Sequence, residues 1–281
     1  MPVNATMTSS LTIGKDLDRI INDCAEVAGT LWERGWAERN AGNLSVNVTD
    51  LLPREPADTR EAPFVEYSIP HPPLGGSSLL ISGTGRRMRD LARNPVANSC
   101  VLRISEDLSG YHVLWGGKHD GGFKPTSELP SHLAIHSLLT KTAPDKKAVL
   151  HTHPNELIAL THYPKYKNAA ELTQLLWSMH PETVVFLNDG IGLVPYRAPG
   201  TDMLADATVE ALEDYPVVLW EKHGCVAVGQ EILGTFDLID TLNKSAGIFL
   251  LCRSAGFVPE GLSKEQIEEI QRLFGAGFRV S

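Results

Sequence analysis

Two histidines separated by one residue stand in the stretch AVLHTHP, residues 148–154. The apolar run before them is typical of a buried strand, and residues i and i+2 of a strand point to the same face. His151 and His153 are therefore expected to project side by side, and Pro154 to end the strand, since it has no N–H to donate. Imidazole is a common metal ligand. The alternative is a strand end with two polar residues near the surface, and a third ligand would favour the metal.

His223 is the candidate for that third ligand. It follows the apolar run VVLW and precedes Gly224, which predicts a strand end or a tight turn. Three neutral imidazoles leave a fourth position of zinc open for water or substrate, which is the arrangement of catalytic zinc sites. A surface turn residue explains His223 equally well, because spacing along the chain does not show which side chains meet in space.

Two carboxylates stand where acid–base chemistry would need them. Glu128, in KPTSELPSH, starts a predicted helix, where it acts either as a general acid or base or as a first-turn carboxylate that complements the helix dipole. Glu182, in HPETVVFLNDG, just precedes an apolar run that we interpret as a strand, and an exposed loop carboxylate is its simplest interpretation. Spacing alone favours the structural interpretation for both.

Several short polar segments carry the groups that bind anions. Glycine turns and helix N-termini present backbone N–H groups, and Ser, Thr and Asn add neutral donors, so such a set can hold a phosphate. Each segment alone is also an ordinary turn. The candidate phosphate-binding residues are Asn40, Asn43, Ser82, Gly83, Thr84, Gly85, Thr126 and Ser127.

The composition excludes several classes of protein. The chain of 281 residues has 25 Lys and Arg against 34 Asp and Glu, a formal net charge of −9, which argues against nucleic-acid and anionic-membrane partners. Its four cysteines form no CxxC pair, which indicates free thiols in a reducing compartment. No apolar run reaches membrane-spanning length, and the N-terminus lacks the pattern of a signal peptide. We therefore expect a cytoplasmic globular protein.

Helical and strand patterns alternate along the chain. Residues 15–35 have the spacing of an amphipathic helix, and 43–50 alternate as a half-buried strand. A helix is predicted from SELPSH with Ser127 as its N-cap. The stretch 182–200 is interpreted as strand, turn and strand, and two hairpins are predicted, at SCVLRISED–GYHVLWGG and at PVVLWEKHGCVAVG.

The same patterns predict one domain over residues 1–281. Residues 50–76 are rich in Pro, Gly and charge, and we interpret them as a long loop or insertion because both flanks continue one α/β pattern. No GxGxxG follows the first strand, so a Rossmann nucleotide fold is not indicated. Periodicity alone leads no further than a mixed α/β or α+β fold.

Six segments in order, GWAERNAGNLSVNV, LLISGTGR, GYHVLWGG, PTSELPSHLAIH, HTHP and LWEKHG, resemble the class II aldolase/adducin family, most closely its rhamnulose-1-phosphate aldolase branch. The resemblance implies an α/β fold with a central, mainly antiparallel sheet flanked by helices. It also implies a homotetramer with active sites between neighbouring subunits, and one Zn²⁺ per subunit held by His151, His153 and His223. Glu128 would be the central acid or base, Glu182 would assist proton transfer from the adjacent subunit, and the phosphate would sit on the eight residues named above.

The implied reaction is reversible cleavage of the sugar phosphate L-rhamnulose 1-phosphate to dihydroxyacetone phosphate and L-lactaldehyde. Zinc would act as a Lewis acid that stabilises the enediolate, in place of the Schiff-base lysine of the other aldolase strategy. Alternatives inside the family are fuculose-1-phosphate aldolase and ribulose-5-phosphate 4-epimerase. A JAMM-type isopeptidase also uses HTHP but continues with Ser and Asp where this chain has His162 and Lys165. An adducin-like interaction domain without metal is the non-enzymatic alternative.

Overall fold

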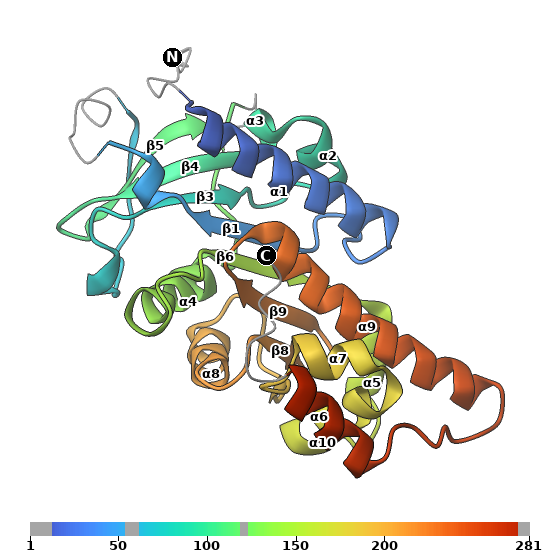
Figure 1. Ribbon diagram of the computed structural model, residues 1–281. Helices are drawn as coiled ribbons and strands as arrows, with labels where there is room; N and C mark the ends of the chain where they lie inside the picture. Colours follow the sequence, from blue (N-terminus) through green and yellow to red (C-terminus); the bar gives the residue numbers. More distant parts are fainter. Residues whose placement is uncertain (1–12, 54–61, 119–122, 275–281) are drawn as a thin grey trace.

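A single sheet forms the centre of the molecule. The computed structural model describes residues 13–53, 62–118 and 123–274, in which the sheet has nine strands (Figure 1). They are β1 (Asn43–Asn47), β2 (Phe64–Glu66), β3 (Ser78–Ser82), β4 (Ser99–Ile104), β5 (Gly110–Gly116), β6 (Ala148–Thr152), β7 (Gly192–Val194), β8 (Val217–Trp220) and β9 (Gly224–Gly229). Their order is β2-β5-β4-β3-β1-β6-β9-β8-β7. Only β7 and β8 are parallel among these described strands, which confirms the expected, mainly antiparallel sheet.

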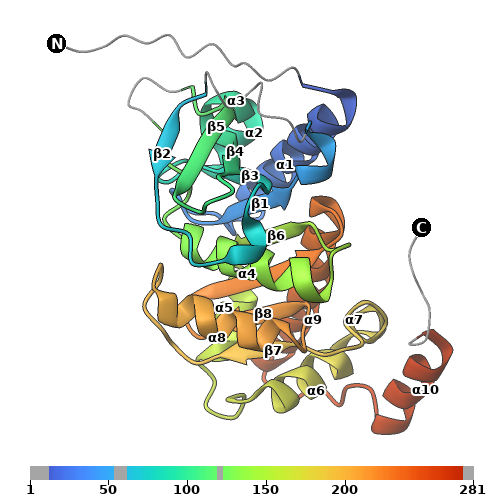
Figure 2. The ribbon, with the colours of Figure 1, turned by 90° about the vertical axis from the view of Figure 1, so that its left-hand side faces the viewer.

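Helices cover both faces of the sheet. The helices of the described residues are α1 (Lys15–Glu33), α2 (Met88–Arg93), α3 (Pro95–Asn98), α4 (Leu129–Thr142), α5 (Asn155–Thr161), α6 (Ala169–Met179), α7 (Pro181–Phe186), α8 (Asp202–Leu212), α9 (Ile232–Ser254) and α10 (Lys264–Phe274). Helices α1 and α9 lie on one face, while α4 and α8 pack together on the other, which Figure 2 views from the front. The expected flanking helices are thus present on both sides.

Alternation along the two central strands decides which side chains meet α4. In β1, Leu44 and Val46 join the core under α1 and α9, so Ser45 points to the α4 face. In β6, Leu150 joins the same core, and His151 therefore points with Ser45 toward α4. The predicted half-burial of this first strand is wrong: Ser45 is fully buried because helices cover both faces of the sheet.

Several predicted elements agree closely with the structure. The first helix ends at Glu33, and Gly35 follows with a positive φ of 72°. Both predicted hairpins form, as β4 with β5 and β8 with β9. In the described ranges, no helix is long and apolar enough to cross a membrane.

Two predictions about local structure are wrong. Residues 181–186 form helix α7 instead of a strand, since a short apolar run fits either element and Pro181 at the first helical position favours the helix. Helix α4 has Glu128, not Ser127, at its N-cap. The segment 50–76, interpreted as a long loop or insertion, contains the edge strand β2 and the short 3-10 turn Pro72–Leu74, and a second 3-10 turn, Thr49–Leu51, spans its start. Its residues 54–61 lie outside the described part of the chain.

Candidate active site

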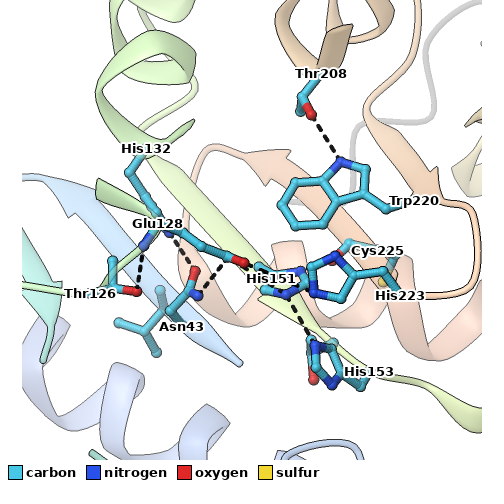
Figure 3. A network of polar contacts seen from close by, with 12 residues as sticks. Asn43, Thr126, Glu128, His132, His151, His153, Thr208, Trp220, His223 and Cys225 are labelled. Carbon is cyan, nitrogen blue, oxygen red and sulfur yellow. Dashed lines mark hydrogen bonds and ion pairs between the residues drawn. The ribbon is translucent and has the colours of Figure 1, made fainter. Parts of the chain in front are cut away.

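The three predicted ligands come from two adjacent strands. His151 is the second-last residue of β6, and His153 directly follows that strand. His223 lies in the turn between β8 and β9, and β9 pairs with β6. The three ring centroids lie 4.9 to 5.1 Å apart, and one nitrogen of each ring lies within 4.8 Å of the other two (Figure 3). The fold therefore brings together side chains that lie 70 residues apart in sequence (223 − 153).

Hydrogen bonds fix the tautomers of two of these rings. Nδ1 of His151 lies 2.8 Å from the carbonyl oxygen of Cys225, and Nδ1 of His153 lies 3.0 Å from a carboxylate oxygen of Glu38. Both Nδ1 atoms must donate, because their partners only accept, so each neutral ring keeps a lone pair on Nε2. These two Nε2 atoms face each other at 3.2 Å.

Two facing lone pairs repel each other unless a cation lies between them. Nitrogens bound to one tetrahedral zinc at about 2.0–2.1 Å are about 3.3 Å apart, close to the observed separation of the two Nε2 atoms. Burial lowers the pKa of His151 to about 3 and that of His223 to about 4, which keeps both rings in the neutral form that binds metals. The donor set and its geometry therefore fit a divalent metal ion.

An aromatic wall closes one side of the cluster. The ring of Trp220 lies 4.4 Å from that of His151 and 5.0 Å from that of His223, between centroids (Figure 3). The indole N–H donates to Thr208 Oγ1 at 2.9 Å, which fixes the ring although it is buried. This wall excludes water from one side of the imidazoles.

Glu128 faces the cluster from the start of α4. Its Oε2 lies 3.6 Å from Nε2 of His151, and its Oε1 lies 3.9 Å from Nε2 of His223. Its side chain is nearly buried, and the side-chain amide of Asn43 donates to Oε2 at 2.8 Å. A carboxylate in this position can exchange a proton with a substrate that also reaches the imidazoles.

A cavity of about 310 Å³ opens over these groups. It is lined by Glu128, by the three histidines and by seven of the eight predicted phosphate-binding residues: Asn40, Asn43, Gly83, Thr84, Gly85, Thr126 and Ser127. Ser82 lies behind the wall, because it is fully buried and its hydroxyl accepts from the backbone N–H of Leu44 at 3.1 Å. The cavity is therefore lined by the three imidazoles, by a carboxylate, and by glycine, asparagine, serine and threonine residues of the kind that bind anions.

Glu182 is not brought to this cavity. It lies in the first turn of α7, its side chain is 55% exposed, and Oε2 pairs with Nε2 of His180 at 3.0 Å. It does not line the cavity over the histidine cluster in the described part of the chain.

Sequence reasoning missed several residues at the site. Glu38, which binds His153, precedes the predicted Asn40 by two positions, and that proximity was the available signal. His132 follows Glu128 by one helical turn, a spacing that places both on one face. Gly224 is needed next to His223, since a Cβ there would lie 2.5 Å from the carbonyl oxygen of Thr152 and 2.8 Å from the ring of His153.

Comparison with known families decides what kind of site this is. The family described as Class II Aldolase and Adducin N-terminal domain matches residues 22–250. The chain belongs to this family. Membership together with the three-histidine site identifies a metal-dependent aldolase, a carbon–carbon lyase, and sets the isopeptidase alternative aside.

Full-length relatives and solved structures agree with this membership. The chain is 45% identical over 272 residues to a rhamnulose-1-phosphate aldolase of Bacteroides thetaiotaomicron, covering 95% of this chain and 98% of the relative. It is 37% identical to the rhamnulose-1-phosphate aldolase of Salmonella schwarzengrund, covering 87% and 89%. A sugar-phosphate aldolase structure from Thermotoga maritima has a TM-score of 0.73 and 34% identity, covering 88% of this chain and all of that one. An L-fuculose 1-phosphate aldolase structure has the same fold, with a TM-score of 0.60 and 19% identity, covering 95% and 99%.

Proposed function

We propose that this class II aldolase cleaves L-rhamnulose 1-phosphate reversibly to dihydroxyacetone phosphate and L-lactaldehyde, in the cytoplasm, with Zn²⁺ as its metal. The observation that carries the proposal is the carboxylate of Glu128, within 4 Å of two imidazoles of the cluster, in a cavity that is also lined by seven of the residues proposed to bind the phosphate. The two curated relatives at 45% and 37% identity, both named rhamnulose-1-phosphate aldolase, support the choice of sugar.

The metal ligands in this proposal are His151, His153 and His223. Three neutral imidazoles suit zinc and leave a position open to substrate. The bound metal supplies Lewis-acid polarisation of the substrate's keto oxygen. The chain has two more tasks, which are to hold the phosphate and to move protons at defined atoms.

Glu128 is the residue that moves the proton at the third carbon of the substrate. In the cleavage direction a base removes the proton of the C4 hydroxyl, and the C3–C4 bond breaks as the aldehyde forms. The electron pair of that bond stays with C3, and the carboxylic acid of Glu128 then delivers its proton to C3, which completes dihydroxyacetone phosphate. The synthetic direction reverses these steps, with Glu128 as the base.

The substrate's phosphate fixes the reacting carbons relative to Glu128. The glycine turn from Gly83 to Gly85, together with Asn40, Thr126 and Ser127, lines the same cavity and supplies neutral donors. Holding the phosphate there places C3 near the carboxylate without any covalent link to the enzyme. In this proposal Asn43 belongs to the same wall, although its amide is already bonded to Glu128.

Glu182 enters the proposal through a neighbouring subunit. We propose a homotetramer in which Glu182 of the partner subunit reaches the cavity and assists proton transfer at the departing aldehyde oxygen. The support is its position, because Glu182 is exposed on α7 and away from the cavity of its own chain.

The test is a comparison of sugar phosphates with purified, zinc-loaded protein. Release of dihydroxyacetone phosphate is followed from L-rhamnulose 1-phosphate and from L-fuculose 1-phosphate, each with and without a chelator. Fast, chelator-sensitive turnover of the rhamnulose ester alone is expected. Preference for the fuculose ester would assign the enzyme to the fuculose-1-phosphate aldolases instead. Release from neither would overturn the aldolase proposal in favour of an epimerase, tested with ribulose 5-phosphate, or a non-catalytic adducin-like domain.

A further inference from the structure

A continuous row of buried polar side chains runs from Glu128 into the protein, away from the cavity. Asn43 Nδ2 lies 2.8 Å from Glu128 Oε2, and Asn43 Oδ1 lies 2.5 Å from His132 Nε2 (Figure 3). His132 Nδ1 lies 2.6 Å from Ser45 Oγ, which in turn lies 2.7 Å from His136 Nε2. All five residues are less than 8% exposed. The cavity over the histidine cluster is not lined by His132, Ser45 or His136.

The donor and acceptor capacities of these groups allow one direction only. The carboxylate of Glu128 accepts, so the amide of Asn43 must present its NH₂ to it and its oxygen to His132. His132 Nε2 therefore carries a proton, and its Nδ1 accepts from the Ser45 hydroxyl. That hydroxyl has no second proton, so His136 must donate to it from Nε2. Every donor in the row points toward the carboxylate.

Burial favours this arrangement of protons. It lowers the pKa of His132 to about 4 and that of His136 to about 3, so both rings stay neutral near neutral pH and each carries one ring proton. A hydrogen-bond chain with all its donors aligned is strengthened by mutual polarisation in a medium of low dielectric constant. A proton on Nδ1 instead of Nε2 in either ring would break this row of hydrogen bonds.

The fold makes Asn43 the link between two residues of one helix. Glu128 and His132 are one turn apart on α4, and the backbone N–H of His132 donates to the carbonyl oxygen of Glu128 at 3.1 Å. Their side chains bind opposite ends of the same amide, which projects from β1 next to His151 of β6. The carboxylate of Glu128 cannot turn away from the histidine cluster without losing its hydrogen bond from Asn43.

We infer that His132 is a positioning residue for the aldol reaction, which holds Glu128 toward the metal cluster through Asn43, and that Ser45 and His136 fix the tautomer that His132 needs. The inference rests on the proposed function only for its kinetic consequence. The direction of the row is a property of the folded protein and can be observed without turnover.

The kinetic experiment compares three variants of the zinc-loaded enzyme. His132→Phe keeps a ring but removes both hydrogen bonds, and we expect kcat to fall tenfold to a hundredfold, since small misplacements of a reacting group cost that much. KM and zinc content should stay within about twofold, because no metal ligand or phosphate group is changed. His132→Gln supplies an amide N–H to Asn43 and should recover most of the loss. Ser131→Ala is the matched control, since Ser131 is an equally buried neighbour on α4 whose hydroxyl has no partner in the described chain.

A double-mutant cycle tests the route of the effect. If His132 acts through Asn43, then His132→Phe should add little to the loss that Asn43→Ala causes alone. Additive losses, or a loss confined to zinc content or to folding stability, would overturn the positioning role. An unchanged kcat in folded, zinc-loaded His132→Phe would do the same.

Neutron diffraction of the deuterium-exchanged wild-type protein tests the direction itself and needs no variant to fold. Deuterium is expected on Nε2 of both His132 and His136, with none on Nδ1 of His132. Deuterium on Nδ1 of His132 would overturn the inference whatever the kinetics show. If the wild-type protein cleaved neither sugar ester while the neutron map agreed, the proposed function would fail and the direction of the row would stand.

Discussion

Two groups of histidines lie on either side of Glu128, and they differ in where their nitrogens point. In the open cluster (His151, His153 and His223), the Nε2 atoms of His151 and His153 face each other at the cavity. In the closed pair (His132 and His136), both nitrogens of His132 and Nε2 of His136 are bonded to protein side chains. Burial lowers the pKa of His151 as strongly as that of the closed pair. The comparison teaches that a buried, neutral imidazole is available to a metal only where the protein leaves a lone pair of one of its nitrogens without a hydrogen-bond donor.

The largest expected effect comes from removing a member of the open cluster. His223→Ala should weaken zinc binding by more than about a hundredfold, which is the upper range for changes outside the ligand sphere, and should abolish cleavage. Zinc affinity measured by chelator competition checks this. His162→Ala is the control, because His162 is exposed and away from the cavity. Wild-type zinc affinity in His223→Ala would contradict the assignment of the third ligand.

The closed pair should appear in the pH dependence of stability. The folded-state pKa values of His132 and His136 lie below the ordinary value of 6.5, so the unfolded chain binds more protons between those values. The contribution of each ring to the free energy of unfolding is therefore complete above about pH 6.5. It decreases as the pH falls toward about 4, by roughly 1.4 kcal/mol per pH unit for each histidine.

Denaturant unfolding between neutral and acid pH measures that slope. His136→Gln removes one of the two titrating rings, so its free energy of unfolding should fall less steeply than that of the wild type, whatever its stability at neutral pH. Metal release from the open cluster contributes equally to both proteins and cancels in the comparison. Equal slopes would mean that His136 is not held neutral in the fold.

A smaller effect is expected from the carboxylate behind His153. Glu38 accepts from Nδ1 of His153, and such partners typically change metal affinity tenfold to a hundredfold when they are altered. Because Glu38 is exposed, we expect Glu38→Gln to lie near the tenfold end. Glu33→Gln, an exposed change at the end of α1, is the control in the same competition assay. A change in cleavage without a change in zinc affinity would assign Glu38 to substrate binding instead.

The difference between the two groups also explains how far the sequence could lead. The spacing of His151 and His153 after an apolar run predicted a shared face, and an apolar run before His223 predicted a strand end or a turn, so local pattern was enough to nominate the three histidines. It could not show that β6 pairs with β9, which is a long-range contact. The mainly antiparallel sheet and the ligand roles came from the resemblance to the family, not from periodicity.

The closed pair was out of reach for the same physical reason. Histidines at positions 132 and 136 on a buried helix have the pattern of ordinary core residues, and their role depends on Ser45, which lies on a strand far away in sequence. Local ambiguity caused the wrong prediction of a strand after Glu182, since VVF fits a strand or a helix and the chain forms α7. The role of Glu182 stays a prediction, because Glu182 does not line the cavity of its own chain.

The smallest expected effect concerns the turn that carries His223. Lys222 has a positive φ of 61°, and its backbone N–H donates to Thr161 Oγ1 at 2.8 Å. Glycine relieves about 1 kcal/mol of strain at such a position but gains similar freedom in the unfolded chain, so Lys222→Gly should change stability by less than about 0.5 kcal/mol. Zinc affinity should not change.

Lys222→Val provides the opposing change at the same position. A β-branched residue is strongly disfavoured at this φ, so the turn must shift and carry His223 away from the two fixed rings. We expect weaker zinc binding together with lower stability, measured by competition and by thermal unfolding. If Lys222→Val lowered stability but left zinc affinity unchanged, the metal itself would be sufficient to hold His223, and the open cluster would not depend on its turn. No metal could hold the closed pair in this way, because the hydrogen-bond partners of its rings are protein atoms.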